Sequence, residues 1–129
     1  TFANGASLAG HVTVEDHATL GGYTLVHQFC VIGAYAFTAF GSVISKDVPP
    51  YMTVSGNPAR ARGLNKEGLR RNAFPAAALK TLQQAYRTLY RSGASPDEQI
   101  EQLRQQAGQD SHVGLLVRFL ERHRRGIIR

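Results

Sequence analysis

Residues 2–48 read, in groups of six, FANGAS LAGHVT VEDHAT LGGYTL VHQFCV IGAYAF TAFGSV ISKDV. The first residue of each group is bulky and apolar in seven cases out of eight: Phe2, Leu8, Val14, Leu20, Val26, Ile32, Thr38 and Ile44. The residue four places later is always small or β-branched: Ala6, Val12, Ala18, Thr24, Cys30, Ala36, Ser42 and Val48. The stretch therefore repeats every six residues without a slip in phase.

A period of six fits neither an α-helix nor a simple alternating strand. It is typical of hexapeptide repeats, in which each hexad is a short strand plus a turn and three hexads form one triangular coil. We expect coils at 2–19, 20–37 and 38–55, stacked about 4.8 Å apart. A small antiparallel sandwich is the alternative, but it favours turn signals every 8–12 residues.

The repeat ends within the chain. Asp47-Val48-Pro49-Pro50-Tyr51 breaks the pattern, and Asn57-Pro58 favours an extended exit. At the other end nothing covers the hexad of Phe2, which we interpret as the loss of an upstream part of the solenoid. The sequence predicts a β-solenoid at 1–57 followed by an α-helical domain at 58–129.

Helical periodicity replaces the hexads after Gly63. We expect a short basic helix over 65–72, a helix from Pro75 towards Gly93, a helix from a capping box at Ser95–Glu98 to about 106, and a last helix over 111–125. Arg122, Arg124 and Arg125 would then lie at the C-terminal end of the last helix, where the helix dipole favours cations. The apolar stripes of these helices indicate core.

Charge is distributed unevenly over the 129 residues. Residues 1–59 carry one base and three acids (1 − 3 = −2), whereas residues 60–129 carry 14 bases and six acids (14 − 6 = +8), in agreement with the net +6. A basic half indicates an anionic partner or a solvated helix face. The bases lack the pattern of a nucleic-acid binder. We predict a cytoplasmic chain without a membrane span, because Cys30 is alone and no apolar run is long enough.

Eight blocks of this sequence resemble the UDP-N-acetylglucosamine acyltransferases of lipid A biosynthesis, over the whole chain. The segments at 27–30 and 65–71 are specific to that family, whereas Gly56-Asn57-Pro58-Ala59 occurs widely in hexapeptide proteins. The matching blocks are Leu8-Ala9-Gly10-His11-Val12, Gly21-Gly22, Val26-His27-Gln28-Phe29-Cys30, Asp47-Val48-Pro49-Pro50-Tyr51, Gly56-Asn57, Asn65-x-Glu67-Gly68-Leu69-x-Arg71, Tyr90-Arg91-Ser92-Gly93 and Arg125-Gly126-Ile127-Ile128-Arg129.

The resemblance implies a left-handed parallel β-helix, a homotrimer, and transfer of a 3-hydroxyacyl chain from acyl carrier protein to the 3-hydroxyl of UDP-N-acetylglucosamine, without a cofactor. It assigns the Gly10 N–H to the thioester oxygen and places His11 and His27 in the active site. Gln28, Asn65, Glu67 and Arg71 match substrate-binding positions. The family's catalytic histidine would lie about nine residues before Thr1, so we expect the chain alone to be inactive.

Two further roles concern the acyl donor. Phe40 matches the position that resembles a stop for the acyl chain, unless its ring turns inward or packs on a neighbouring coil. Arg87 and Arg91, one turn apart, could engage the acidic carrier protein, although a solvated helix face explains the same residues.

Two other functions compete with this one. A zinc-dependent lyase of the carbonic anhydrase type would use converging histidines, such as His11, His17 and His27. However, His11 and His17 occupy different turns of one coil, so we expect no metal site. The second is a non-catalytic trimerising fragment with a tail that binds acidic proteins. We interpret His17 and His112 as surface residues and Cys30 as a core residue.

Overall fold

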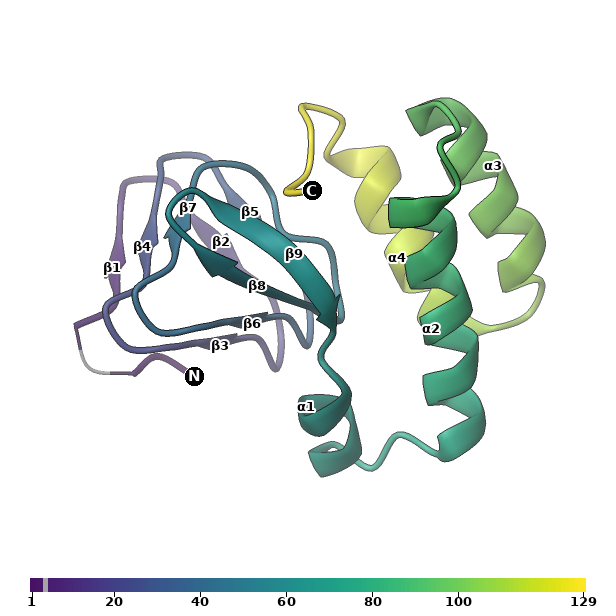
Figure 1. The fold of residues 1–129 in the computed structure, drawn as a ribbon, viewed down its shortest axis with the longest axis horizontal. Helices are drawn as coiled ribbons and strands as arrows, with labels where there is room; N and C mark the ends of the chain where they lie inside the picture. Colours follow the sequence, from purple (N-terminus) through teal and green to yellow (C-terminus); the bar gives the residue numbers. More distant parts are fainter. Residues whose placement is uncertain (4) are drawn as a thin grey trace.

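The structure, a computed structural model, describes residues 1–3 and 5–129. Within these residues the chain forms nine strands followed by four helices. Figure 1 shows the strands stacked on one side and α2, α3 and α4 side by side on the other. No helix among the described residues combines the length and the apolar character that crossing a membrane requires.

The first seven strands are two residues long and pair only in parallel. They form the sheets β1-β4-β7 and β2-β5 and contribute to the sheet β3-β6-β8-β9. Ser7 pairs with Leu25 and Leu25 with Val43, so paired residues lie 18 positions apart. Three hexads thus separate paired strands, as the period predicts. The strands are β1 (Ser7–Leu8), β2 (Thr13–Val14), β3 (Thr19–Leu20), β4 (Leu25–Val26), β5 (Val31–Ile32), β6 (Phe37–Thr38) and β7 (Val43–Ile44).

A residue with a left-handed backbone turns the chain between successive strands. These residues recur every six positions: Gly5, His11, His17, Tyr23, Phe29, Tyr35 and Gly41. They define three columns of turns, which we call corner A (21–24 and 39–42), corner B (9–12, 27–30 and 45–47) and corner C (15–18, 33–36 and 49–51). A non-glycine residue rarely adopts this backbone conformation, so the hexad imposes it.

The bulky hexad positions fill the interior of the stack. Leu20, Val26, Ile32 and Ile44 are fully buried. Phe2 and Leu8 belong to the same columns but are 53% and 38% exposed, because the described residues place no coil below them. The inward residues therefore form a core that is covered at one end and open at the other.

The third coil differs from the prediction. Ile32 pairs with Val48, and Thr38 pairs with Val54 in β8 (Met52–Gly56), so both pairs lie 16 residues apart and not 18. The missing pair of residues falls at corner B. Asp47, 2% exposed, compensates there, because its Oδ1 accepts a hydrogen bond of 2.8 Å from the Val31 N–H. In the coil below, the equivalent Thr13 N–H donates to a backbone carbonyl, that of Cys30.

The solenoid continues past the predicted boundary at 57/58. β9 (Ala59–Leu64) folds back and pairs antiparallel with β8, which adds an edge strand to the sheet β3-β6-β8. The chain then enters α1 (Lys66–Arg71), whose N-cap is Asn65. This cap also binds the solenoid, because its Nδ2 donates to the Tyr35 carbonyl at 2.9 Å.

The helices lie close to the predicted ranges. α2 (Ala76–Arg91) begins one residue after Pro75, which is its N-cap. α3 (Pro96–Ala107) carries the predicted cap, since Ser95 Oγ accepts from the Glu98 N–H. α4 (Ser111–Arg122) ends three residues earlier than predicted. The placement of Arg124 and Arg125 at its C-terminal end was therefore wrong.

A cluster of aromatic side chains joins the helices to corner C. Tyr51 is fully buried, and its hydroxyl donates to the His112 carbonyl at 2.7 Å. Burial raises the pKa of this hydroxyl well above its ordinary value. Phe74 packs against Tyr35, Tyr51 and His112. His112 is thus half-buried in this cluster, and its interpretation as a surface residue was incomplete.

Candidate functional site

Corner B brings together four of the predicted site residues. Gly10 and His11 lie in its first turn, and His27 and Gln28 lie one coil above. The turns are aligned by hydrogen bonds from Ala9 N–H to the Val26 carbonyl and from His27 N–H to the Ile44 carbonyl. All four residues are exposed. The period of 18 therefore stacks residues that are far apart in sequence.

The backbone at Gly10 is open. A methyl group added at this residue would meet no atom within 4 Å. Among the described residues the Gly10 N–H has no hydrogen-bond acceptor. A free N–H on an accessible turn can donate to a developing oxyanion.

His11 is held by a ring in the coil above. Its imidazole stacks on Phe29 with the centroids 5.3 Å apart and the planes 14° apart. Phe29 is itself half exposed and left-handed, with φ +68°. Cys30 follows in the turn but points into the core, as predicted, and burial raises the pKa of its thiol.

A second group of predicted residues lies on α1. Asn65, Glu67 and Arg71 line a groove of about 510 Å³ beside the outward residues of the sheet β3-β6-β8, which are Thr19, Phe37 and Thr53. Arg71 and Glu67 form an ion pair of 2.7 Å, with both side chains at least three-quarters exposed. Such a pair is weak in water, so the guanidinium can exchange the carboxylate for a phosphate.

The two groups do not meet within one chain. Corner B lies between the sheets β1-β4-β7 and β2-β5, whereas the α1 groove lies on the third sheet. In the described residues no hydrogen bond or ion pair links them. Phe40 is separate from both. It lies at corner A, 74% exposed, with its ring edge-on to Tyr23 of the neighbouring coil at 5.3 Å.

The histidines considered for zinc do not converge. His11 is at corner B and His17 at corner C, where its ring stacks on Tyr35 at 4.8 Å. Among the described residues no three His, Cys, Asp or Glu side chains are grouped as metal ligands. His11 and His17 lie at different corners, so within one chain they do not converge on one ion.

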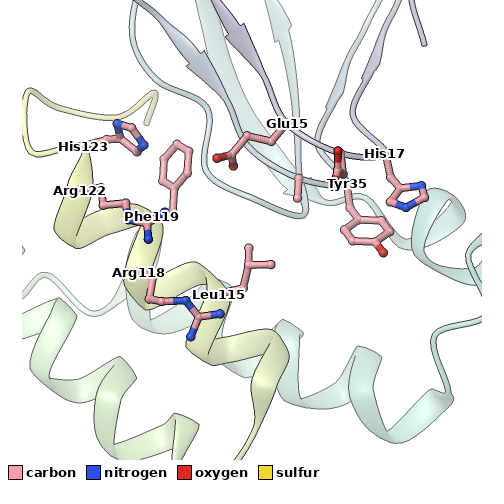
Figure 2. Close-up of a pocket in the computed structure, with 10 residues that line it drawn as sticks. Glu15, His17, Tyr35, Leu115, Arg118, Phe119, Arg122 and His123 are labelled. Carbon is pink, nitrogen blue, oxygen red and sulfur yellow. The ribbon is translucent and has the colours of Figure 1, made fainter.

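A further cavity lies between α4 and the solenoid, with a volume of about 400 Å³. Glu15 approaches it from the solenoid, and Arg118 and Arg122 approach it from α4 (Figure 2). Because its lining comes from both the solenoid and α4, the cavity lies at the contact between the two parts of the chain.

The sequence did not reveal a basic groove between α1 and α2. Lys66 and Arg70 contribute from α1, and Lys80 and Arg87 contribute from α2, around a space of about 470 Å³. Arg91, predicted to act with Arg87, lies over the Tyr86 ring at 6.0 Å. Spacings of four and seven residues place each pair on one helix face, but only the structure shows that the two faces meet.

Comparison with known proteins links these features to one family. The family model described as UDP-N-acetylglucosamine O-acyltransferase, domain 2, matches residues 47–128. The acyl-[acyl-carrier-protein]–UDP-N-acetylglucosamine O-acyltransferase of Alkalilimnicola ehrlichii is 51% identical over all of this chain, which covers 50% of that protein. The corresponding protein of Thiobacillus denitrificans is 51% identical over 99% of the chain, again 50% of its length.

Two crystal structures agree with the sequence relatives. The UDP-N-acetylglucosamine O-acyltransferase of Moraxella catarrhalis superposes with a TM-score of 0.95 at 40% identity, over 99% of this chain and 50% of that one. A homologous structure from Acinetobacter baumannii gives 0.94 at 40% identity with the same coverage. The chain spans about half the length of the curated relatives it matches. The chain belongs to the UDP-N-acetylglucosamine O-acyltransferase family.

Proposed function

We propose that the full-length protein transfers a 3-hydroxyacyl chain from acyl carrier protein to the 3-hydroxyl of UDP-N-acetylglucosamine, the first step of lipid A biosynthesis, in the cytoplasm. The relatives' names support both substrates. The strand order and the 18-residue register support a parallel β-helix within 1–57, for which the resemblance implies a left hand, and the antiparallel strand β9 joins it to the helical elements of 58–129. The observation that carries the proposal is corner B, which stacks Gly10 and His11 beneath His27 and Gln28.

The chemistry follows from what corner B offers. The free Gly10 N–H donates to the thioester oxygen as negative charge develops there. His11, His27 and Gln28 are exposed around it and position the acyl group and the sugar. The base that deprotonates the sugar hydroxyl comes from outside these residues, as the resemblance implies. Asn65, Glu67 and Arg71 hold the UDP moiety, with the guanidinium on the diphosphate.

Gly10→Ala tests this assignment. The added methyl group meets no protein atom, so the fold should be unchanged, but it would stand where the thioester approaches the N–H. We expect transfer from 3-hydroxyacyl carrier protein to UDP-N-acetylglucosamine by the full-length protein to fall about 100-fold. Wild-type rates in this variant would contradict the role of Gly10. An inactive wild-type protein would favour the non-catalytic alternative.

A homotrimer is the assembly that we propose. The sheet β1-β4-β7 exposes Leu25, which is 41% accessible. The corners on either side of this sheet expose at least half of the surface of Tyr23, Phe29 and Phe40. An exposed apolar face of this kind favours association. Packing between subunits would also bring corner B of one chain to the α1 groove of its neighbour. Light scattering that returns the mass of one subunit would contradict this assembly.

Phe40→Gly is expected to lengthen the preferred acyl chain. The Phe40 ring is 74% exposed, so it can occupy space in a groove between subunits. Each buried CH₂ contributes about 0.8 kcal/mol, so space for two more methylenes would shift selectivity roughly tenfold. Mass spectrometry of the products from a mixture of acyl carrier proteins measures the shift. An unchanged profile would mean that Phe40 only packs against Tyr23.

The basic groove between α1 and α2 is our proposed contact for the acidic carrier protein. It contains four cationic side chains and, among its described lining residues, no acid. We expect Arg87→Gln to weaken carrier binding about fivefold at low salt, and we expect wild-type affinity to fall as salt rises. Arg104→Gln is the control, because Arg104 pairs with Glu101 and Glu121 outside the groove. Affinity that is insensitive to ionic strength would exclude this contact.

A further inference from the structure

The chain that follows α4 returns to the solenoid at corner B (Figure 1). We call residues 124–129 the C-terminal strap. Ile127 and Ile128 are buried, and the Ile128 N–H donates to the Asp47 carbonyl at 2.9 Å. The Tyr90 hydroxyl holds the Ile128 carbonyl at 2.9 Å. The strap therefore connects the helical domain to corner B, at the turn one coil above His27 and Gln28.

Its far end is fixed on the helical side. Arg129 donates to the Leu89 carbonyl at 3.0 Å and to Gln99 Oε1 at 3.2 Å. Gln99 is 5% exposed, which is unusual for a glutamine and is consistent with this bond. Residues 127–129 are thus anchored on both sides, and Arg125 extends from this fixed base.

Arg125 and Asp47 both contact the end of the 27–30 turn of corner B. Arg125 Nη2 donates to the Phe29 carbonyl at 2.6 Å, and Asp47 Oδ1 accepts from the Val31 N–H at 2.8 Å. Their side chains lie 3.9 Å apart. The two contacts therefore bracket Cys30 and fix the end of the turn that begins with His27 and Gln28.

The orientation of Phe29 matters for both coils of corner B. Its backbone is left-handed, a conformation that persists in a bulky residue only when its surroundings impose it. Its ring stacks on His11, and its backbone follows directly after Gln28. A rotation of this residue would change the ring on which His11 stacks and the backbone next to His27 and Gln28.

We propose that Arg125 is a positioning residue for the acyl transfer. By holding the Phe29 carbonyl it keeps the turn of 27–30, and through the Phe29 ring His11, in the orientation that the reaction requires. The inference rests on the proposed function, but its structural part stands or falls separately.

The test compares Arg125→Ala with Arg124→Ala in the full-length protein. Arg124 is the matched control, because it is an exposed arginine of the same strap that pairs with Asp97. The first readout is NMR of histidine labelled at Cε1. In Arg125→Ala we expect the His11 and His27 signals to shift, because the Phe29 ring current changes at His11 and the turn moves at His27. We expect them to stay in place in Arg124→Ala.

The second readout is kinetic. We expect kcat to fall about tenfold in Arg125→Ala with the KM for UDP-N-acetylglucosamine within twofold, because orientation is lost while the α1 groove is intact. Arg125→Lys keeps one donor for the Phe29 carbonyl and should recover most of kcat. Melting temperatures of the three variants should agree, because these side chains are largely exposed.

The outcomes separate the two proposals. Unchanged His11 and His27 signals in Arg125→Ala would overturn the positioning role, whatever the activity. Equal signal shifts and equal loss of kcat in Arg124→Ala would also overturn it, since the effect would then belong to the strap's charge. A wild-type protein that binds neither substrate and transfers no acyl group would overturn the proposed function, and the NMR comparison would still decide the role of Arg125 in the turn.

Discussion

Gly33→Ala is expected to lower the free energy of unfolding by about 3 kcal/mol, a value at the upper end for overpacking of a tight interior. A methyl group at Gly33 would lie 2.4 Å from Pro50 N and 2.7 Å from Pro50 Cδ. Neither atom can move freely, because both belong to the proline ring that is part of the main chain of the next coil. The hydrogen bond of 2.8 Å from the Gly33 N–H to the Val48 carbonyl would lengthen as the coils separate.

Urea denaturation of Gly33→Ala and Gly10→Ala side by side measures this effect. Both glycines lie in the solenoid outside its strands, but the added methyl group meets no atom at Gly10. We expect the Gly10 variant to unfold within about 0.5 kcal/mol of wild type. Equal stability of the two variants would show that the coils at Gly33 and Pro50 can move apart at little cost.

Asp47→Ala should destabilise the fold by about 2–3 kcal/mol. The carboxylate is 2% exposed and is the acceptor for the Val31 N–H. Its removal leaves a buried donor without a partner, which costs roughly 1–3 kcal/mol. The nearby Arg125 also loses its carboxylate neighbour. The shortened corner of the third coil would then lack the group that closes it.

Asp47→Asn separates the hydrogen bond from the charge. The amide oxygen can still accept from the Val31 N–H, so we expect less than half of the loss measured for alanine. Thermal and urea unfolding of the two variants give the comparison. A loss in asparagine as large as in alanine would assign the stability to the negative charge beside Arg125.

The hexad period predicted the strands because one bulky residue per hexad must point inward at each strand. Val26, Ile32 and Ile44 do so. The shortened spacing in the third coil could not be predicted from the hexads. Val48 still occupies the small-residue position of its hexad, but it pairs with Ile32, 16 residues earlier in place of 18. The residue types at 45–47 show only that the hexad pattern is interrupted there. That an aspartate side chain replaces a backbone carbonyl there is a tertiary effect.

The helix ends show the same limit. Ser95 caps its helix as the capping box predicted, whereas Asn65, which was predicted inside the first helix, is the N-cap of α1. The end of α4 depends on Ile127 and Ile128, which must leave the helix to be buried beside Asp47. Local preference favours Arg124 and Arg125 in the last turn, but burial of two isoleucines outweighs it.

The candidate site was predictable only in part. The 18-residue spacing of Gly10 and Gln28 predicts that they stack, and the pairing of β1 with β4 agrees. The sequence could not show that Arg71 lies on a different face, because that depends on how α1 docks through Asn65 onto Tyr35. Arg125 was visible only as part of a motif. Its contact spans 96 residues and has no local signal.

The left-handed corners have a consequence for how this chain folds. His11, His17, Tyr23, Phe29 and Tyr35 each hold a backbone conformation that costs about 1 kcal/mol outside glycine. A single coil makes no sheet bonds of its own, so it cannot offset that cost until it lies on a finished neighbour. Among the coils of this 129-residue stretch, folding should therefore spread one coil at a time from β8 and the helices towards β1. Amide hydrogens should exchange most slowly around Val48–Val54 and progressively faster towards Ser7.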